Sequence, residues 1–119
     1  MCKVLYIDDD VSHGEFFKAI CKKRQDMFCD TVDNLMDAKK LIETKNYDVY
    51  ITDFLLGEDT GLDIIEEYPN RKWFLITAVP EEFIDNDIKN NEHIIEILYK
   101  PISINHALET IDKYSVQRV

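Results

Sequence analysis

The sequence predicts an α/β protein in which helices cover both faces of a parallel β-sheet. Short apolar runs alternate along the chain with segments whose apolar residues recur at helical spacing. The runs are continuous rather than interrupted by alternating polar residues, which is typical of parallel strands buried on both faces. Five strand segments, each followed by a helical segment, therefore favour an α/β sandwich built on one sheet.

Five apolar runs are expected to form the strands of this sheet. They comprise residues 4–7, about 27–32, 47–52, 73–77 and 94–99. The fourth run is apolar almost throughout, and we expect its Trp73 to contribute bulk to the core. The fifth run stops where Lys100-Pro101 follows.

The first three helical segments have start signals of their own. Ser12, with Glu15 three residues later, matches a capping box at the start of the first helix. Asp33 is the expected N-cap of the second helix. A loop that contains Gly57 and Gly61 precedes a short third helix.

The last two helices are predicted from proline and from apolar spacing. Pro80 suits the start of the fourth helix. Its inner face would be formed by Phe83, Ile84 and Ile88. The fifth helix is expected over residues 104–115, because its apolar residues fall on one side.

Composition fits a globular protein and argues against several functions. At 119 residues, 45% apolar and 32% charged, the chain fits one domain over residues 1–119. The net charge of −10 argues against direct nucleic-acid binding, which needs basic side chains. No apolar run approaches the roughly 20 residues of a membrane helix, and no signal-peptide pattern is present. We therefore expect a cytoplasmic protein without membrane contacts, whose three cysteines are reduced thiols.

Polar residues stand where four of the predicted strands end. They are Asp8, Asp9, Asp10, Asp53, Thr77 and Lys100. Ligands of open α/β sheets bind outside the carboxyl ends of the strands, so these side chains are expected at one edge. Several carboxylates at one point repel each other, and a hard cation such as Mg²⁺ would relieve that repulsion.

This set of groups is sufficient for phosphoryl transfer onto the protein. A carboxylate beside a metal ion can attack a phosphoryl group and form an acyl phosphate. The metal and a lysine neutralise charge on the transferring group, while a hydroxyl can donate to one of its oxygens. The strand ends thus supply metal ligands, a nucleophile, a hydroxyl and a cation.

Four segments at the strand ends resemble the receiver domain of two-component response regulators. They are Val4 to Asp9, Tyr47 to Asp53 with Gly61 eight residues later, Leu75 to Ala78, and Leu98 to Pro101. The resemblance covers essentially the whole chain, in the family's order. It implies a flavodoxin-like (βα)5 three-layer sandwich whose five-stranded parallel sheet has the order 2-1-3-4-5. The chain would be a stand-alone regulator or a receiver cut from a longer protein.

The resemblance also assigns roles in the acidic cluster. Asp53 matches the phosphoacceptor, Asp9 a direct Mg²⁺ ligand, and Asp8 an acid that acts largely through water. The backbone carbonyl of Leu55 would complete the protein's metal ligands. Gly57 stands where the family usually has proline.

Two further residues match groups that contact the phosphoryl group. Thr77 matches the switch hydroxyl, and Lys100 matches the pairing lysine, which precedes a cis peptide bond to Pro101. The family's aromatic switch residue lies three positions before the lysine, where this chain has Ile97. Tyr99 is aromatic but lies one residue before the lysine, on the same strand face as Ile97.

By this resemblance the chain is a signalling module rather than a turnover enzyme. It would accept a phosphoryl group on Asp53 in a Mg²⁺-dependent reaction and then alter its binding to a downstream protein. The donor would be a phosphohistidine on a sensor histidine kinase or a histidine phosphotransfer protein. The site would catalyse both its own phosphorylation and its own dephosphorylation.

Two other functions fit parts of the pattern. A pseudo-receiver would keep the fold without phosphorylation, and the atypical Ile97 keeps this hypothesis open. A haloacid-dehalogenase-like phosphatase would use Asp8 as nucleophile and Asp10 as acid/base, because residues 6–12 resemble that family's opening. Against it, the chain offers little room for a cap and lacks a late acidic motif. Substituting Asp53 separates the receiver from the phosphatase.

The remaining polar residues have ordinary structural explanations. Asp10 is expected to be a solvated loop acid or a helix cap. His13, His93 and His106 lack the spacing of metal ligands, so we expect them to be surface histidines.

Overall fold

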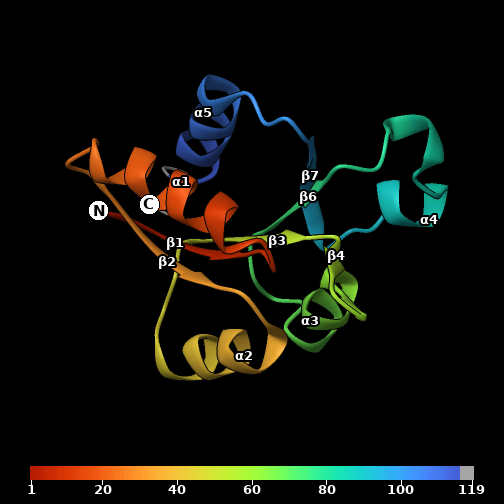
Figure 1. Ribbon diagram of the computed structural model, residues 1–119. Helices are drawn as coiled ribbons and strands as arrows, with labels where there is room; N and C mark the ends of the chain where they lie inside the picture. Colours follow the sequence, from red (N-terminus) through yellow and green to blue (C-terminus); the bar gives the residue numbers. More distant parts are fainter. Residues whose placement is uncertain (116–119) are drawn as a thin grey trace.

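The computed structural model, which describes residues 1–115, contains a five-stranded parallel sheet between layers of helices (Figure 1). The strands are β1 (Cys2–Ile7), β2 (Met27–Val32), β3 (Val49–Asp53), β6 (Trp73–Thr77) and β7 (Ile94–Tyr99). Their order is β2-β1-β3-β6-β7, and all neighbours are parallel. This is the predicted 2-1-3-4-5 order, so the predicted fold class is confirmed. Residues 116–119 of the predicted domain lie outside the described residues.

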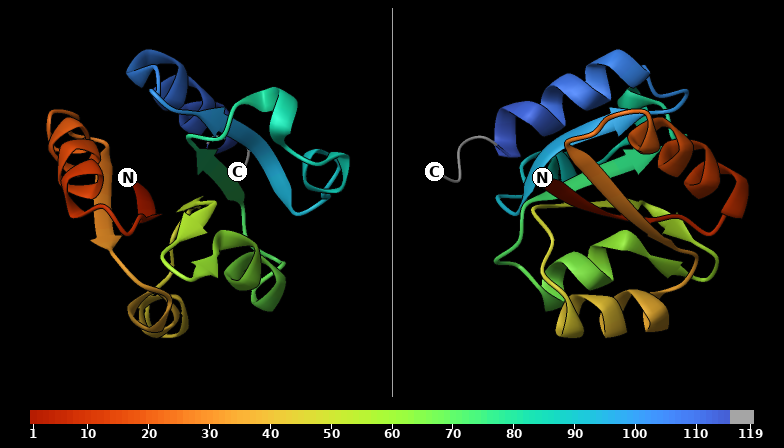
Figure 2. Two further views of the ribbon diagram at one scale, coloured as in Figure 1. Left: turned by 45° about the vertical axis from the view of Figure 1, so that its right-hand side comes forward. Right: turned by 90° about the vertical axis from the view of Figure 1, so that its left-hand side faces the viewer.

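The longer helices pack on both faces of the sheet. They are α1 (Val11–Lys22), α2 (Leu35–Thr44), α3 (Gly61–Glu67) and α5 (Ile104–Ser115). Figures 1 and 2 show α1 and α5 on one face and α2 and α3 on the other. Val4 and Tyr6 of β1 pack toward the first pair, whereas Leu5 and Ile7 pack toward the second. The strands are therefore apolar throughout because both of their faces are buried. No helix within residues 1–115 is long and apolar enough to cross a bilayer.

Two helix starts differ from the prediction. Asp10, not Ser12, is the N-cap of α1, because its carboxylate accepts a hydrogen bond from the Ser12 N–H at 3.0 Å. The predicted capping box is therefore wrong. Asn34, not Asp33, caps α2, and its side-chain oxygen accepts from the Asp37 N–H at 2.8 Å. In both cases the cap is the residue whose extended backbone directly precedes the first helical turn.

The connection between β6 and β7 departs furthest from the prediction. It contains a 3-10 helix, η1 (Glu81–Phe83), and a one-turn helix, α4 (Asn86–Lys89). Pro80 precedes η1 rather than a longer α-helix. Phe83, predicted to face inward, is 73% exposed, whereas Ile84 is 5% exposed and Ile88 is half-buried. With one fully buried apolar side chain, this segment lacks the stripe that would support a longer amphipathic helix.

The predicted loop after β3 forms a short antiparallel ribbon. Its strands are β4 (Leu55–Leu56) and β5 (Asp59–Thr60). Gly57 turns the ribbon with φ 63°, a left-handed conformation that favours glycine. A Cβ on Gly61 would lie 2.8 Å from the Thr52 Oγ1 and would overlap the carbonyl oxygen of Asp53. The two glycines thus let the ribbon and α3 approach the end of β3 closely.

Candidate functional site

The parallel topology brings the predicted site residues to the carboxyl edge of the sheet. Asp8 and Asp9 directly follow β1, and Asp53 is the last residue of the neighbouring β3. Thr77 ends β6 and Lys100 follows β7. This edge is where an open α/β sheet binds its ligands.

Three carboxylates form the centre of the site. Asp8 and Asp53 are buried, with 2% and 7% of their surface exposed, whereas Asp9 is exposed. One carboxylate oxygen from each of the three lies within 4.8 Å of the others. Three negative charges at this separation need a compensating positive charge.

Lys100 supplies part of that positive charge. Its Nζ donates to the Asp53 Oδ2 at 2.7 Å and to the Asp8 Oδ2 at 3.2 Å. Burial alone would lower the pKa of the Lys100 ammonium, but the hydrogen bond and charge of Asp53, with a contribution from Asp8, raise it above its usual value. The lysine therefore stays charged at the site. The Lys100–Pro101 peptide bond is cis.

Asp53 lies in an environment that disfavours its charge when no metal is bound. Burial raises the pKa of its carboxyl group, the Lys100 hydrogen bond partly offsets this, and the nearby charge of Asp8 raises the pKa further. The Leu55 N–H donates to the Asp53 Oδ1 at 3.3 Å. One lysine thus compensates the three carboxylates incompletely, which favours binding of a cation.

Asp8 and Asp9 differ in how strongly the protein holds them. The Asp8 carboxylate accepts from the Tyr6 hydroxyl at 3.3 Å and from the Asp10 N–H at 3.0 Å, besides Lys100. Burial, and then the charge of Asp8, raise the pKa of Tyr6, so its hydroxyl keeps the proton that it donates. Asp9 accepts from the Gly57 N–H at 3.0 Å. A proline at position 57 would lack that donor.

The two residues predicted at switch positions, Thr77 and Ile97, lie on neighbouring strands. Thr77 is buried, and its hydroxyl oxygen accepts from the Val79 N–H at 3.0 Å. In the pairing of β6 with β7, Thr77 is level with Tyr99, and Leu75 is level with Ile97. Ile97 is half-buried against the cluster on the α2–α3 face of the sheet. A purely apolar side chain therefore stands where the resemblance predicts an aromatic switch residue.

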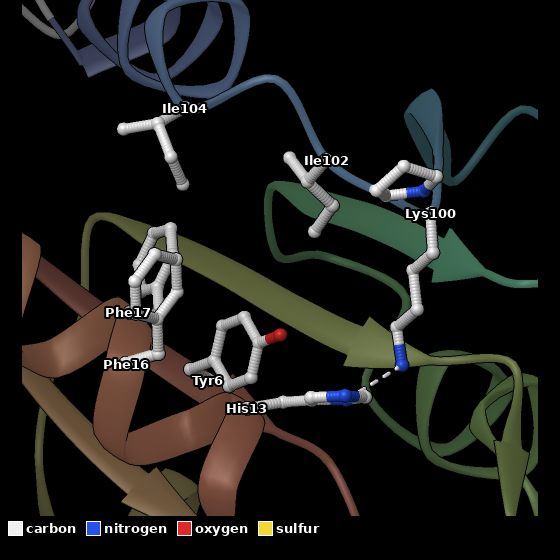
Figure 3. A pocket seen from close by; sticks show the side chains of 8 residues that line it. Tyr6, His13, Phe16, Phe17, Lys100, Ile102 and Ile104 are labelled. Carbon is white, nitrogen blue, oxygen red and sulfur yellow. Dashed lines mark hydrogen bonds between the residues drawn. The ribbon is translucent and has the colours of Figure 1, made fainter.

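The structure adds one residue to the site that the sequence prediction left out. His13 Nδ1 lies 3.1 Å from the Lys100 Nζ and 3.2 Å from the Asp8 Oδ2 (Figure 3). Its side chain is 45% exposed, as expected of a surface histidine, but its ring contacts the site. The sequence feature that could have predicted this contact is the short link between β1 and α1. It places the first turn of the helix at the edge that holds Asp8.

An apolar pocket of about 230 Å³ adjoins Lys100. Figure 3 shows that α1 contributes Phe16 and Phe17, while Ile102 and Ile104 come from the chain after β7. The ring of Tyr6 stacks on Phe17, and its hydroxyl donates to Asp8, so Tyr6 belongs to both the pocket and the site. The acidic cluster with Lys100 and this apolar pocket are therefore adjacent.

Comparison with known families agrees with the fold. A model of the response regulator receiver domain family matches residues 4–112. The chain belongs to this family, whose members act in two-component signalling. Receiver domains are signalling modules rather than turnover enzymes, and histidine kinases are their general partners. An acidic triad such as Asp8, Asp9 and Asp53 is typical of the receiver Mg²⁺ site.

Solved receiver structures share the fold at low sequence identity. The receiver domain of Francisella response regulator 1452 is 24% identical, with a TM-score of 0.84 and 100% of each chain covered. A two-component response regulator from Clostridium difficile is 20% identical, with a TM-score of 0.86, covering 99% of this chain and 98% of that one. No protein of curated function matched the chain.

One further relative was solved in a modified state. A response regulator protein from Burkholderia pseudomallei, solved with a phosphorylated aspartic acid, calcium ion and citrate, is 19% identical. Its TM-score is 0.80, and the match covers 98% of this chain and 70% of that one. At this identity the likeness shows the fold alone.

Proposed function

We propose that residues 1–119 form a receiver that accepts a phosphoryl group on Asp53 in a Mg²⁺-dependent reaction. The donor is a phosphohistidine on a sensor histidine kinase or a histidine phosphotransfer protein. One observation carries the proposal. The Asp53 carboxylate is 2.7 Å from the Lys100 ammonium, and its oxygen lies within 4.8 Å of those of Asp8 and Asp9.

The donor set fits Mg²⁺, which prefers a few carboxylates together with carbonyl and water oxygens. Asp9, Asp53 and the carbonyl of Leu55 would hold the ion directly, while Asp8 would act largely through water. The contacts support these different roles. The Asp8 carboxylate already accepts several hydrogen bonds, whereas the Asp9 carboxylate is exposed and accepts one, from the Gly57 N–H. When bound, the ion neutralises charge on the phosphoryl group.

The reaction on the protein side is a displacement at phosphorus. A carboxylate oxygen of Asp53 attacks, so a P–O bond forms while the P–N bond to the donor's imidazole breaks. The imidazole leaves with the bonding electron pair and takes a proton from solvent. Lys100 stays protonated and pairs with the phosphoryl oxygens, and the Thr77 hydroxyl donates to one of them.

We expect the conformational change that follows phosphorylation to begin in the residues directly after Thr77. Its hydroxyl accepts from Val79 at present, and turning toward a phosphoryl oxygen would release that N–H. The side chain of Ile97 has no polar group that could form a hydrogen bond as the Thr77 hydroxyl moves. The altered segment therefore begins at Val79, and its change would switch binding of a downstream protein.

Intact-mass spectrometry with acetyl phosphate and Mg²⁺ tests this function. We expect the wild type to gain the mass of one phosphoryl group, and to gain none in EDTA or with Asp53→Asn. Asp26→Asn is the matched control, because Asp26 precedes β2 at the opposite edge of the sheet, pairs with Arg24, and should leave the mass gain intact.

Two outcomes of this experiment would support other functions. An unchanged wild-type mass would support the pseudo-receiver. A mass gain that survives Asp53→Asn would place the acceptor elsewhere, as the phosphatase hypothesis does at Asp8. That hypothesis is already weakened, because the family match is to receivers and the Asp8 carboxylate is fully buried.

A further inference from the structure

Among residues 1–115, three groups lie in hydrogen-bond range of the Lys100 ammonium: two are carboxylates at the strand ends, and the third is on α1. The Lys100 Nζ is 2.7 Å from the Asp53 Oδ2, 3.2 Å from the Asp8 Oδ2 and 3.1 Å from the His13 Nδ1. An ammonium group carries three N–H donors and no acceptor. The three contacts therefore match the donors one for one, and Figure 3 shows the imidazole of His13 directed at the lysine.

The contacts of His13 favour one position for its ring proton. A hydrogen bond from Lys100, which can only donate, requires Nδ1 to accept and the neutral ring to carry its proton on Nε2, whereas the other tautomer would donate from Nδ1 to the Asp8 Oδ2 at 3.2 Å. The Nε2 atom lies 3.4 Å from the Asp10 Oδ2, an acceptor. Asp10 in turn accepts from the N–H and the hydroxyl of Ser12, at 3.0 Å and 2.5 Å. The ring is thus oriented by the cap of α1 on one side and holds Lys100 on the other.

The other two histidines differ from His13 in this respect. His106 pairs with Glu96 at 2.8 Å, and His93 lies 3.6 Å from the neighbouring Glu92. Within residues 1–115, neither imidazole contacts Asp8, Asp53 or Lys100. His13 therefore stands apart among the histidines, although all three have exposed or half-buried positions.

We propose that His13 is a positioning residue, which holds the Lys100 ammonium toward Asp53 by accepting its third hydrogen bond. This inference rests on the proposed phosphorylation of Asp53. A lysine ammonium sits on a flexible four-carbon stem, so losing one of three anchors allows it more orientations. During transfer Lys100 exchanges an Asp53 oxygen for a phosphoryl oxygen, and His13 keeps the ammonium in place.

The test combines a rate with a direct view of Lys100 in three variants. His13→Ala removes the acceptor, and His13→Asn places an amide oxygen near the position of Nδ1. His106→Ala removes an imidazole of α5 that pairs with Glu96, and serves as the matched control. In the resting protein, ¹⁵N NMR of the lysine ammonium groups reports how fast the Lys100 protons exchange with water. The initial rate of phosphorylation by acetyl phosphate and Mg²⁺ reports the reaction.

We expect His13→Ala to speed proton exchange at Lys100 and to slow phosphorylation by about tenfold, the effect of one hydrogen bond to a charged group. His13→Asn should restore most of both properties, and His106→Ala should change neither. Unchanged Lys100 exchange in His13→Ala would overturn the inference, as would failure of His13→Asn to restore exchange and rate. A wild type that takes up no phosphate would contradict the proposed function instead, and the NMR arm would still decide the His13 contact.

Discussion

The carboxyl edge of β1 and β3 and the connection between β6 and β7 are held in place by different means. At the edge, sheet pairing fixes the backbone of Asp53, whose carboxylate is then bonded by Lys100 and by the Leu55 N–H. In the connection, Ile84 is the fully buried apolar anchor, and η1 and α4 are short local turns. The carboxyl edge is therefore fixed by sheet pairing and side-chain hydrogen bonds, whereas the connection depends on local turns and one buried side chain.

The contrast has a functional consequence. A segment with few buried apolar contacts is one of the first to open or rearrange locally. The β6–β7 connection begins directly after Thr77, the residue proposed to respond to the phosphoryl group. We therefore expect phosphorylation to change this connection more than the sheet edge that carries Asp53.

The largest loss in the free energy of unfolding is expected from Gly61→Ala, at the carboxyl edge of β3. The added Cβ would overlap the Asp53 carbonyl oxygen and crowd Thr52, and backbone cannot move aside cheaply. We expect urea unfolding to show a loss of about 3 kcal/mol. In Gly14→Ala, the control, the Cβ meets the Thr31 Cβ at 3.3 Å inside α1, and the helix gains propensity. Its free energy of unfolding should stay within about 1 kcal/mol of wild type, and equal losses in both variants would contradict the close approach at Gly61.

A smaller loss is expected in the connection, and only from its anchor. Ile84→Ala should lower the free energy of unfolding by about 2 kcal/mol, because it removes a side chain that is 5% exposed. Phe83→Ala, one residue earlier, should cost no more than about 0.5 kcal/mol, because that ring is 73% exposed. A larger loss from Phe83→Ala than from Ile84→Ala would mean that the segment packs through its other face.

The smallest effect is expected in the pH dependence of stability without metal. Burial raises the pKa of Asp53 in the folded protein, so the folded state holds that proton more tightly than the unfolded state. In EDTA, wild type should therefore lose stability relative to Asp53→Asn as the pH rises above the unfolded value of about 3.9. The measurement is the slope of the unfolding free energy against pH.

Asp10→Asn gives the opposite sign in the same experiment. The hydrogen bond from the Ser12 hydroxyl lowers the pKa of Asp10, so this group stabilises the fold above its unfolded pKa and less as the pH falls. Wild type should therefore gain stability over Asp10→Asn as the pH rises. Slopes of the same sign for the two variants would contradict the environment described for Asp53.

The site residues at the carboxyl edge of the sheet could be predicted from the sequence, because strand ends and sheet order determine where they lie. Asp8, Asp53 and Lys100 each directly follow or end an apolar run, and parallel pairing leaves them at one edge. Trp73 is fully buried, as predicted for a core residue. The signal at each position was a change from apolar to polar residues, which requires no knowledge of side-chain contacts.

Positions that depend on local geometry were not predictable in the same way. His13 contacts the site because of where α1 begins, and the sequence placed that start at Ser12 instead of Asp10. The spacing of Phe83, Ile84 and Ile88 fits a helix, but only Ile84 is fully buried. Alternative cap residues and alternative short turns differ only slightly in free energy. Tertiary packing, which the sequence pattern does not show, therefore decides which of them forms.

The phosphoryl group itself can be located by reductive trapping. After incubation with acetyl phosphate and Mg²⁺, borohydride converts an aspartyl phosphate to homoserine, and tandem mass spectrometry of peptides identifies the position. We predict homoserine at position 53, with Asp8, Asp9 and Asp10 unmodified. Homoserine at position 8, or at none of these positions, would contradict the proposal that Asp53 is the phosphoacceptor.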